Sequence, residues 1–589
     1  MDESNASTQV RRYGVRSVWA HLAMCAATAV MLTLAFPLPG WSFMAYVALV
    51  PVGVLAMRTH RLRTLAWTSY LVFVAWWVLR TLWLKDVHLV APFAVAFVCA
   101  AWFSLALVGL AAVQRRFRGA MTITLPVFWC VQEFVRTNFP LGGFAWFTLG
   151  SSQAAWREGE SPGLVVQSAD LFGWITVSFL VAMTSGLIVD LIARPLTKRL
   201  STGPIRPRRT IVVAALLWAG CMTAALIYGG QRVANTPAAD DPGARKVVVG
   251  IIQTNVPQSN KREGSDEDIV QRRRNDFETL IDLSTISAGD DPRPDLLVWP
   301  ETMVTRPVND EAWALAQAGR LNEGATAEIT TFREGIVRLV ETQGVPVVVG
   351  NQSWGFPTHE RTMNSALLVK PGEPSFQRYS KMHRVPLGEY IPGPEWLRKI
   401  FQKYISPYGE DHDYTVQPGE GVVIFEVDAA DGGGSPGPTP VRFAAPICYE
   451  DAIAGQCRKM VYASDGTKRA DLLVNLTNDG WYAGSHQGYQ HVQIAALRCI
   501  ENRVPMARSV NTGVSGLIDS AGRVGPLVSV AGEHQLVAGH VNAVAVLDER
   551  ATFYGRVREG FSVGLCAVAG LLLLGVFVPG GTKRRERGG

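Results

Sequence analysis

Long apolar stretches dominate the first 230 residues of this chain, and they constrain its fold more than any other feature. A helix that crosses a bilayer needs about 20 mostly apolar residues. Eight stretches come near that length, at roughly 18–36, 41–57, 64–84, 88–113, 119–138, 165–193, 210–229 and 561–579. Hydropathy supports the third and the fifth less strongly, because they contain Arg80 and the pair Glu133 and Arg136. The sequence therefore predicts a polytopic α-helical membrane bundle of eight spans.

The first stretch is not expected to be a cleaved signal peptide. It lacks a clear small-residue cleavage site, and another apolar stretch follows it at once.

Basic residues alternate along the expected spans, and this alternation predicts their orientation. Short loops rich in Lys and Arg stay on the cytoplasmic side of a membrane. Basic segments precede the first span and follow the second, fourth, sixth and eighth, at 11–16, 58–63, 115–118, 194–209 and 583–587. The alternate connections carry little more than Lys85, Arg136 and Arg157. We therefore expect both termini in the cytoplasm and the long segment 230–560 on the outer side.

Charge divides the chain into regions. Residues 1–230 hold 19 Lys and Arg against 8 Asp and Glu, whereas residues 231–558 hold 33 against 40. We expect a membrane bundle with seven transmembrane helices at 1–230, an extracytoplasmic domain at 231–558, and an eighth transmembrane helix with a basic tail at 559–589. The net charge of +6 is concentrated in the expected cytoplasmic loops, so no nucleic-acid partner is expected. With 48% hydrophobic residues and 8 cysteines in 589 residues, the chain is neither disordered nor a disulfide scaffold.

The segment 231–558 alternates short apolar runs with amphipathic stretches. Strands are expected at 246–253, 295–299, 345–351, 364–369, 422–427, 441–447 and 471–476, and helices near 266–287, 325–343 and 486–503. This alternation predicts an α/β or layered αββα domain. The Gly- and Pro-rich segment 431–440 separates two of the expected strands, which indicates a hairpin insertion.

Three of the eight cysteines lie outside the expected spans. Cys448, Cys457 and Cys499 fall in the outer domain, and Cys457 and Cys499 could pair or stay free. Cys25, Cys99, Cys130, Cys221 and Cys566 fall in spans, where a small apolar role is expected. Cys448 ends an apolar strand, so the next backbone N–H groups could stabilise an oxyanion. On position alone, a packed cysteine at a strand end is the more common case.

Two further motifs favour a nucleophilic role for Cys448 over a packing role. The segment 295–301 places Glu301 just after a buried strand, where a carboxylate can act as a general base. The segment 379–386 places Lys381 in a loop that precedes Glu389 and Tyr390. A glutamate, a lysine and a cysteine in this order, each at the end of a strand, is similar to the pattern of the nitrilase superfamily.

The chain as a whole resembles the bacterial apolipoprotein N-acyltransferases, in which a nitrilase-like αββα domain is inserted before the last of eight spans. The resemblance covers nearly the whole chain and rests on segments 132–136, 144–150, 299–301, 388–390, 448–450, 477–481, 498–502 and 511–513. One departure is that Lys261, Arg262 and Glu263 stand where the family commonly has a tryptophan. Thr254 also replaces a usual glycine.

The resemblance implies a role for each of these residues. Cys448 would be the nucleophile, Glu301 the general base, and Lys381 the group that stabilises the oxyanion together with the backbone N–H of Tyr449. Glu389 and Glu450 would support this triad, and Glu389 would orient Lys381. Candidate substrate or lid residues are Tyr390, Trp396, Phe401, Asn478 and Trp481.

The resemblance also implies a reaction and a location. A phospholipid would donate an acyl chain to Cys448 as a thioester, and the N-terminal amine of a diacylglyceryl-cysteine apolipoprotein would accept it, in a ping-pong sequence. The enzyme would be a monomer in the bacterial inner membrane, with its catalytic domain outside the cytoplasm. No cofactor or metal is expected, because the sequence has neither a zinc-type His/Cys cluster nor a Gly-rich phosphate loop.

The segment 395–405 predicts an amphipathic helix with Trp396 and Phe401 on one face. It is either a lid in the headgroup region of the bilayer or a peripheral helix packed on the domain.

Two other functions use the same features. A membrane-tethered nitrilase-type amidase would share the triad but would need only one span. A lipid-binding or transport protein would carry an inactive nitrilase-like domain. The intact Glu301, Lys381 and Cys448 argue against this alternative.

Overall fold

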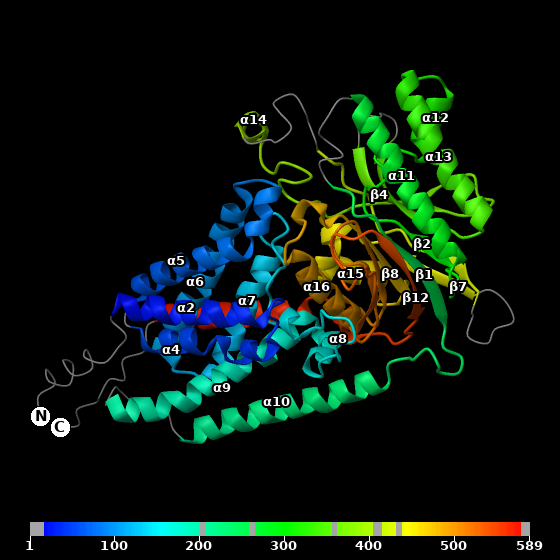
Figure 1. The fold of residues 1–589 in the computed structure, drawn as a ribbon. Helices are drawn as coiled ribbons and strands as arrows, with labels where there is room; N and C mark the ends of the chain where they lie inside the picture. Colours follow the sequence, from blue (N-terminus) through cyan, green and yellow to red (C-terminus); the bar gives the residue numbers. More distant parts are fainter. Residues whose placement is uncertain are drawn as a thin grey trace, which may run out of the picture.

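The structure is a computed structural model that describes residues 17–59, 61–200, 208–257, 266–355, 362–404, 415–430 and 439–578. A helical bundle and an α/β domain lie side by side in it (Figure 1). The expected basic segments 11–16 and 583–587 lie outside these ranges, as do 201–207 and the departing residues Lys261, Arg262 and Glu263.

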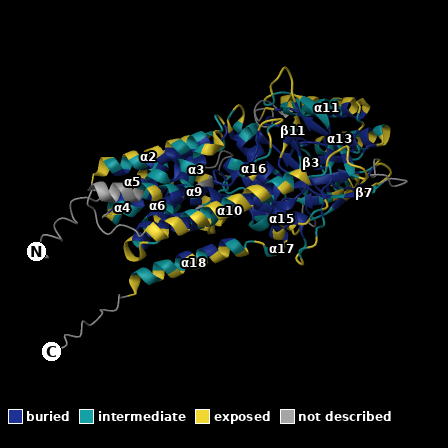
Figure 2. Ribbon diagram, turned by 90° about the horizontal axis from the view of Figure 1, so that it is seen from below, coloured by how far each residue is buried: buried dark blue, intermediate teal, exposed yellow. Residues whose placement is uncertain are grey.

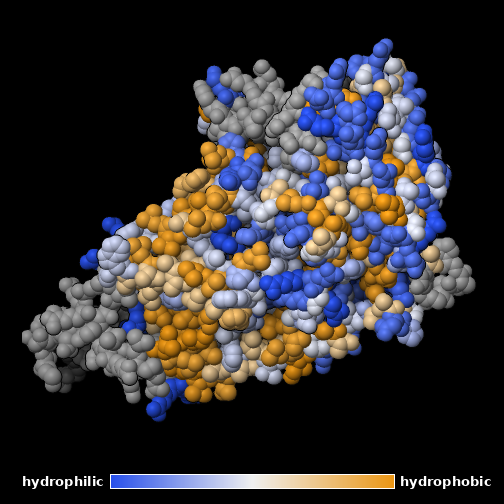
Figure 3. Space-filling model, in the orientation of Figure 1, coloured by the Kyte–Doolittle hydropathy of each residue, from blue (hydrophilic) through white to orange (hydrophobic). Residues whose placement is uncertain are grey.

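Within the described residues, six helices of the bundle are long and apolar enough to cross a membrane. They are α2 (Val18–Ala35), α5 (Leu62–Arg80), α6 (Ala91–Phe117), α9 (Trp174–Leu200, apolar to Ile192), α10 (Arg208–Ala234) and α18 (Gly560–Phe577). Many of their large apolar side chains are exposed, as the yellow stretches of α10 and α18 in Figure 2 illustrate, and hydrophobic residues gather over this half of the surface (Figure 3). An apolar exposed surface of this extent is stable in lipid and not in water. The chain is a membrane protein.

The other two expected spans also form helices of the bundle, but they are less apolar or shorter. The stretch 41–57 is broken into a 3-10 turn, α3 (Ala45–Ala48) and α4 (Val50–Arg58). The stretch 119–138 is α7 (Met121–Asn138), which carries Glu133 and Arg136 in its interior. The sixth span was expected from 165, whereas its helix begins at Trp174. A 3-10 turn and α8 (Ala169–Phe172) precede it, and Gly173, at φ +81°, separates them from α9.

The α/β domain is built on two six-stranded sheets. The first has the order β12-β1-β2-β3-β4-β5, with β1 (Lys246–Gln253), β2 (Leu296–Val298), β3 (Val347–Trp354), β4 (Thr362–Val369), β5 (Gln377–Ser380) and β12 (Gly539–Val546). The second has the order β11-β10-β9-β8-β7-β6, with β6 (Phe425–Ala429), β7 (Thr439–Ala444), β8 (Leu472–Thr477), β9 (Met506–Val510), β10 (Gly516–Ile518) and β11 (Val524–Leu527). The seven expected strands are confirmed. The antiparallel pairing of β6 with β7 also confirms the expected hairpin.

Alternation along the strands of the first sheet produces its two buried faces. In β2, Leu296 and Val298 pack toward the second sheet, whereas Leu297 and Trp299 pack with the helices outside. Those outer helices are α11 (Asp266–Gly289), α12 (Asp310–Gln317) and α13 (Glu323–Gln343). Successive side chains of a strand point to opposite faces of the sheet. Apolar residues at every position are therefore typical of a sheet that is covered on both sides.

The second sheet is covered by α15 (Ala454–Val461) and α16 (Gln487–Asn502), which lie between it and the bundle (Figure 1). The layers therefore run helix, sheet, sheet, helix, as expected for an αββα sandwich, and the membrane bundle packs against the inner helical layer.

Buried polar contacts fix the domain on the bundle. The carboxylate of Asp170 accepts hydrogen bonds from Arg503 Nε (2.9 Å) and Arg232 Nε (2.7 Å). The backbone N–H of Trp174, where α9 begins, donates to Glu501 Oε1 of α16 at 2.6 Å. Bundle residues hold α16 at its carboxyl end. The strand ends beside α16 are therefore fixed in position relative to the bundle helices.

Candidate active site

The candidate residues come together because they follow strands of the two facing sheets. Glu301 follows β2, Cys448 follows β7 and Asn478 follows β8, all at the carboxyl ends of parallel strands. Lys381 follows the edge strand β5. Gly350 lets β3 pass close to Glu301, because a Cβ there would clash with the Pro300 carbonyl.

Lys381 and two glutamates form a buried ion-paired cluster. Lys381 Nζ lies 2.9 Å from Glu389 Oε1 and 3.4 Å from Glu301 Oε1. Asn364 Nδ2 donates to the same two oxygens, at 3.1 Å and 2.7 Å. The backbone N–H of Asn478 donates to Glu301 Oε2 at 2.9 Å. Four polar contacts therefore fix the Glu301 and Lys381 side chains, and Asn364, on β4, is a site residue that the sequence analysis missed.

Cys448 begins the 3-10 helix η6 (Cys448–Ala452) in a left-handed conformation, with φ +51°. A non-glycine residue in this region is strained, and such strain is common where a nucleophile is held on a sharp turn. Unlike the buried Lys381, Cys448 is partly exposed. The expected strand-to-helix turn is confirmed.

The thiol and the lysine influence one another's protonation. Burial raises the pKa of the Cys448 thiol well above its usual value, and the Glu301 carboxylate raises it further, whereas Lys381 lowers it in part. Burial alone would lower the pKa of Lys381, but Glu389, Glu301 and Cys448 together outweigh it and hold the pKa well above the usual value. The ammonium group is therefore kept charged, and the thiol needs a base to lose its proton.

Glu450 ties the nucleophile turn to the lysine loop. Its carboxylate accepts from the backbone N–H groups of Ile447 (2.9 Å), Met382 (2.8 Å) and His383 (2.9 Å), and from the Tyr379 hydroxyl (2.9 Å). Burial raises the pKa of Glu450 to about 7, although these donors lower it. These contacts place Glu450 between the turn that carries Cys448 and the loop that carries Lys381; its supporting role stays a prediction.

Tyr449 joins the nucleophile turn to the bundle. Its hydroxyl donates to the Gly143 carbonyl (3.1 Å) and accepts from the Ala145 N–H (3.3 Å). Its ring stacks on Trp146, with centroids 5.5 Å apart and planes 4° apart. The loop that follows α7 therefore lies directly against the residue after Cys448.

Cys448 lines a cavity of about 230 Å³ between the domain and the bundle. Most of its walls are apolar side chains of the bundle, including Trp83, Val95, Val98, Phe144 and Trp146. Phe139 and Leu141 also line it and are 60% and 51% exposed, so the cavity reaches the apolar surface of the bundle. An apolar cavity with a few polar groups near its reactive residue fits a ligand with a hydrocarbon chain.

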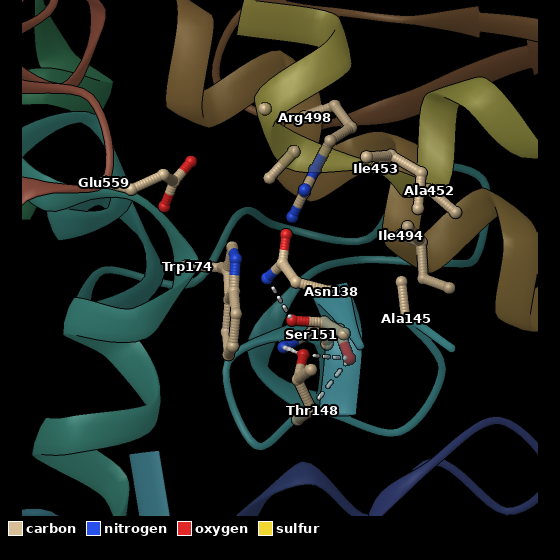
Figure 4. A pocket seen from close by; sticks show the side chains of 13 residues that line it. Asn138, Ala145, Thr148, Ser151, Trp174, Ala452, Ile453, Ile494, Arg498 and Glu559 are labelled. Atoms are coloured by element: carbon tan, nitrogen blue, oxygen red, sulfur yellow. Dashed lines mark hydrogen bonds between the residues drawn. The ribbon is translucent and has the colours of Figure 1, made fainter. Parts of the chain in front are cut away.

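A smaller cavity of about 30 Å³ lies at the same interface but does not include Cys448. Its lining is more polar, and Asn138 and Arg498 point toward each other across it, with Ser151 and Thr148 below (Figure 4). A space of this size holds one or two waters at most, so it is not the substrate cavity.

A buried network stands behind the nucleophile turn. His491 Nε2 lies 2.6 Å from Asp451 Oδ1, Arg508 pairs with the other oxygen of Asp451, and His491 Nδ1 lies 3.5 Å from Asp479 Oδ1. Burial alone would lower the pKa of His491, but Asp451 outweighs it and raises the pKa to about 9. The sequence analysis missed this network, because its four residues lie in four separate elements and form no local motif.

The remaining candidates lie outside the cluster. Tyr390 packs beneath the Arg384 guanidinium, 4.3 Å from its ring centroid. Tyr482 of η7 (Asp479–Tyr482) lines the cavity, whereas Trp481 is not among the lining residues. The segment 395–405 forms α14 (Glu395–Tyr404), where Trp396 is 64% exposed; the side chain of Phe401 lies outside the described residues.

The two other cysteines of the domain, Cys457 and Cys499, are both free and buried. Within the described ranges, no group of three His, Cys, Asp or Glu residues is arranged to hold a metal.

Comparison with known proteins identifies both halves of the chain. The family profile "Apolipoprotein N-acyltransferase N-terminal domain" matches residues 28–187, and "Carbon-nitrogen hydrolase" matches residues 275–540. The apolipoprotein N-acyltransferase of Geobacter metallireducens is 26% identical over 572 residues, covering 93% of this chain and 94% of its own. That of Chlorobaculum tepidum is 28% identical over 570 residues, covering 90% and 91%.

Among solved structures, an amidase from Nesterenkonia sp. covers 56% of this chain and 98% of its own, with 12% identity and a TM-score of 0.34. The two profiles and the near full-length relatives agree, so the chain belongs to the apolipoprotein N-acyltransferases, membrane enzymes of the nitrilase superfamily.

Proposed function

We propose that this protein transfers an acyl chain from a phospholipid to the N-terminal amine of a diacylglyceryl-cysteine apolipoprotein, through a thioester on Cys448. The observation that carries the proposal is the position of Cys448. It lies beside a buried Glu301–Lys381 pair and opens into an apolar cavity that the membrane bundle and the nitrilase-like domain share. A soluble amide substrate would need no such cavity at the level of the spans.

In the first half-reaction, Glu301 takes the thiol proton as Cys448 Sγ attacks the ester carbonyl of the phospholipid. The negative charge that develops on the carbonyl oxygen is stabilised by Lys381 and by the backbone N–H of Tyr449. The intermediate then collapses, the ester C–O bond breaks, and the lysophospholipid leaves with the proton from Glu301. A charged donor in a site closed to water can lower such a barrier strongly.

In the second half-reaction, the amine of the apolipoprotein attacks the thioester. Glu301 takes a proton from the attacking nitrogen and returns it to the leaving sulfur, so that an amide and the free thiol result. The protonation described above supports these roles: the thiol needs a base, and the lysine stays charged throughout. Glu389 holds the lysine, and Glu450 holds the loop that carries it.

The proposed setting is the bacterial inner membrane, with eight spans, both termini in the cytoplasm, the domain on the outer side, and a monomer as the working unit. The alternation of basic segments along the expected spans supports it. We also propose that α14 contacts the headgroup region and acts as a lid, since Trp396 and Ile400 are exposed on it.

Intact-mass measurement after mixing the purified protein with phospholipid tests the function. We expect one acyl mass on the wild type, none on Cys448→Ala, and an unchanged mass gain on the matched control Cys499→Ala, whose buried thiol does not line the cavity. Addition of a diacylglyceryl-cysteine peptide should then remove the acyl group from the protein and add it to the peptide.

The same measurement separates the rivals. An amidase would show no acyl transfer to the peptide, and a lipid-binding protein would show no covalent adduct. An acyl mass that persists on Cys448→Ala would contradict the proposed mechanism.

A further inference from the structure

Arg136 is a buried arginine in the last turn of α7, and it lines the same cavity as Cys448. Its side chain is 1% exposed. A buried charge at this depth is costly, and an ionisable residue within a membrane bundle usually serves a function.

Only part of its guanidinium group is used by the protein. Nη1 donates to the carbonyls of Phe144 and Trp146, both at 2.7 Å. One face of the group lies over the Trp77 ring, 5.0 Å from its centroid. These contacts do not involve the Nε and Nη2 atoms. Neither atom has a hydrogen-bond partner of oxygen or nitrogen among the described residues. The thiol of Cys99, another lining residue, lies alongside.

The carboxylate nearest along the helix does not satisfy this edge. Glu133 Oε1 accepts from Trp129 Nε1 (2.9 Å) and from the Leu149 N–H (2.8 Å). Within the described part of the chain, Glu133 and Arg136 form no ion pair, and Glu133 Oε2 also lacks a hydrogen-bond donor. Glu133 therefore offsets some of the charge without supplying the two acceptors that Nε and Nη2 require.

The Nε and Nη2 hydrogens of an arginine point in parallel, so this edge can donate to two oxygens of one phosphate or carboxylate. Since the cavity around it is apolar, the oxyanion that fits must be joined to a hydrocarbon chain. Trp146 links the edge to the reactive centre, because its carbonyl is held by Arg136 and its ring stacks on Tyr449, next to Cys448.

We propose that Arg136 binds the phosphodiester of the acyl-donor phospholipid and so positions its ester at Cys448. This inference rests on the proposed function for the identity of the lipid, and it makes Arg136 a substrate-binding residue supplied by the membrane bundle. Phosphate binding by the bundle and acyl transfer by the domain then act on one molecule, which accounts for the cavity being shared between them.

The test is the binding of a diether phosphatidylglycerol to the full chain in detergent micelles, measured by native mass spectrometry. This lipid keeps the phosphodiester but has no ester for Cys448 to attack, so its binding does not depend on catalysis. The comparison ligand is the matching dialkylglycerol, which lacks the phosphate. Inorganic phosphate, measured in the same way, distinguishes a lipid phosphate from free phosphate.

We expect Arg136→Gln to weaken binding of the diether phospholipid about 10- to 100-fold, the range for lost charge-assisted hydrogen bonds, and to leave dialkylglycerol binding unchanged. Arg136→Lys keeps the charge without the paired donors and should give a smaller loss. The matched control is Arg80→Gln, because Arg80 also stacks on an aromatic ring, 5.2 Å from the Phe147 centroid, but does not line the cavity. It should bind both lipids like the wild type.

An equal loss of both lipids in Arg136→Gln would overturn the assignment, because Arg136 would then only support the loop of Phe144 and Trp146. Unchanged phospholipid binding would overturn it directly, and phosphate bound as tightly as the lipid would overturn the lipid as ligand. If the wild type binds the diether lipid through Arg136 but never acylates Cys448 from an ester phospholipid, the proposed function fails while this inference stands.

Discussion

Replacing Asn364 with leucine removes the one neutral side chain that holds both glutamates of the site. Asn364 Nδ2 donates to Glu301 Oε1 at 2.7 Å and to Glu389 Oε1 at 3.1 Å. Its Oδ1 accepts no hydrogen bond from the described residues. Leucine has nearly the same shape, so Asn364→Leu deletes only the two donated bonds. Among the described residues, Lys381 then remains as the sole partner of both Oε1 atoms.

The expected size of the effect follows from the charge of the acceptors. A hydrogen bond to a charged group contributes about 1.5–3 kcal/mol. The longer bond, to Glu389, is the weaker of the two, and Lys381 compensates for part of the loss. We therefore expect a net cost of about 2–3 kcal/mol in the transition state, which is a decrease of about 30- to 150-fold in the rate of Cys448 acylation.

The assay is single-turnover acylation of Cys448 by phospholipid, followed by intact mass over time. The matched control is Ser365→Ala on the same strand, which removes the buried hydrogen bond between Ser365 Oγ and Ser380 Oγ (3.0 Å) and touches neither glutamate. It should acylate like the wild type. An Asn364→Leu protein that acylates at the wild-type rate would refute the argument that this amide orients the base and the lysine.

Three further predictions concern the oxyanion, the pH dependence of stability and the lid. Lys381→Met should lower the acylation rate at least 100-fold, measured in the same assay, because it removes the buried charge beside the ester oxygen. The pKa of His491 is raised from 6.5 to about 9, so its contribution to stability is complete below about pH 6.5 and is lost as the pH rises through about 9. The thermal midpoint of His491→Gln should therefore lie below that of the wild type at pH 6 and approach it at pH 10, whereas the exposed control His486→Gln should follow the wild type throughout. Replacing Trp396 and Ile400 with serine should slow turnover of vesicle-embedded donor but not of donor in micelles; equal rates with vesicles would exclude the lid.

Much of the fold could be predicted from local patterns. The strands β1 to β4, β7 and β8 are largely apolar and buried, and such runs are recognisable because their sheets are buried on both faces. In β6, buried Phe425, Val427 and Ala429 alternate with exposed Glu426 and Asp428. The strands β5 and β9 to β12 were not predicted, since they are short or interrupted by polar residues. In β9, Arg508 and Ser509 are buried only because Asp451 and the backbone of other strands satisfy them.

The candidate triad could also be predicted from the sequence, because Glu301, Lys381 and Cys448 each lie in a recognisable motif. The residues that orient the triad could not be predicted in this way. Asn364 stands inside an ordinary strand, and His491 pairs with Asp451 from another segment. Arg136 was noted in the sequence as a charge in an expected span and as part of the segment 132–136, and nothing in the sequence pointed to it as a binding residue.

The sequence by itself determined that the chain enters a membrane, that an αββα domain interrupts its spans, and that a glutamate, a lysine and a cysteine each stand at the end of a strand. These properties depend on periodicity and on local composition, which a single sequence carries. Only the tertiary structure decided that the bundle supplies the walls of the cavity beside Cys448, that Arg136 lines the same cavity, and that its Nε and Nη2 atoms have no hydrogen-bond partner among the described residues. Burial and hydrogen-bond satisfaction arise between segments that are hundreds of residues apart, so no local pattern could show them.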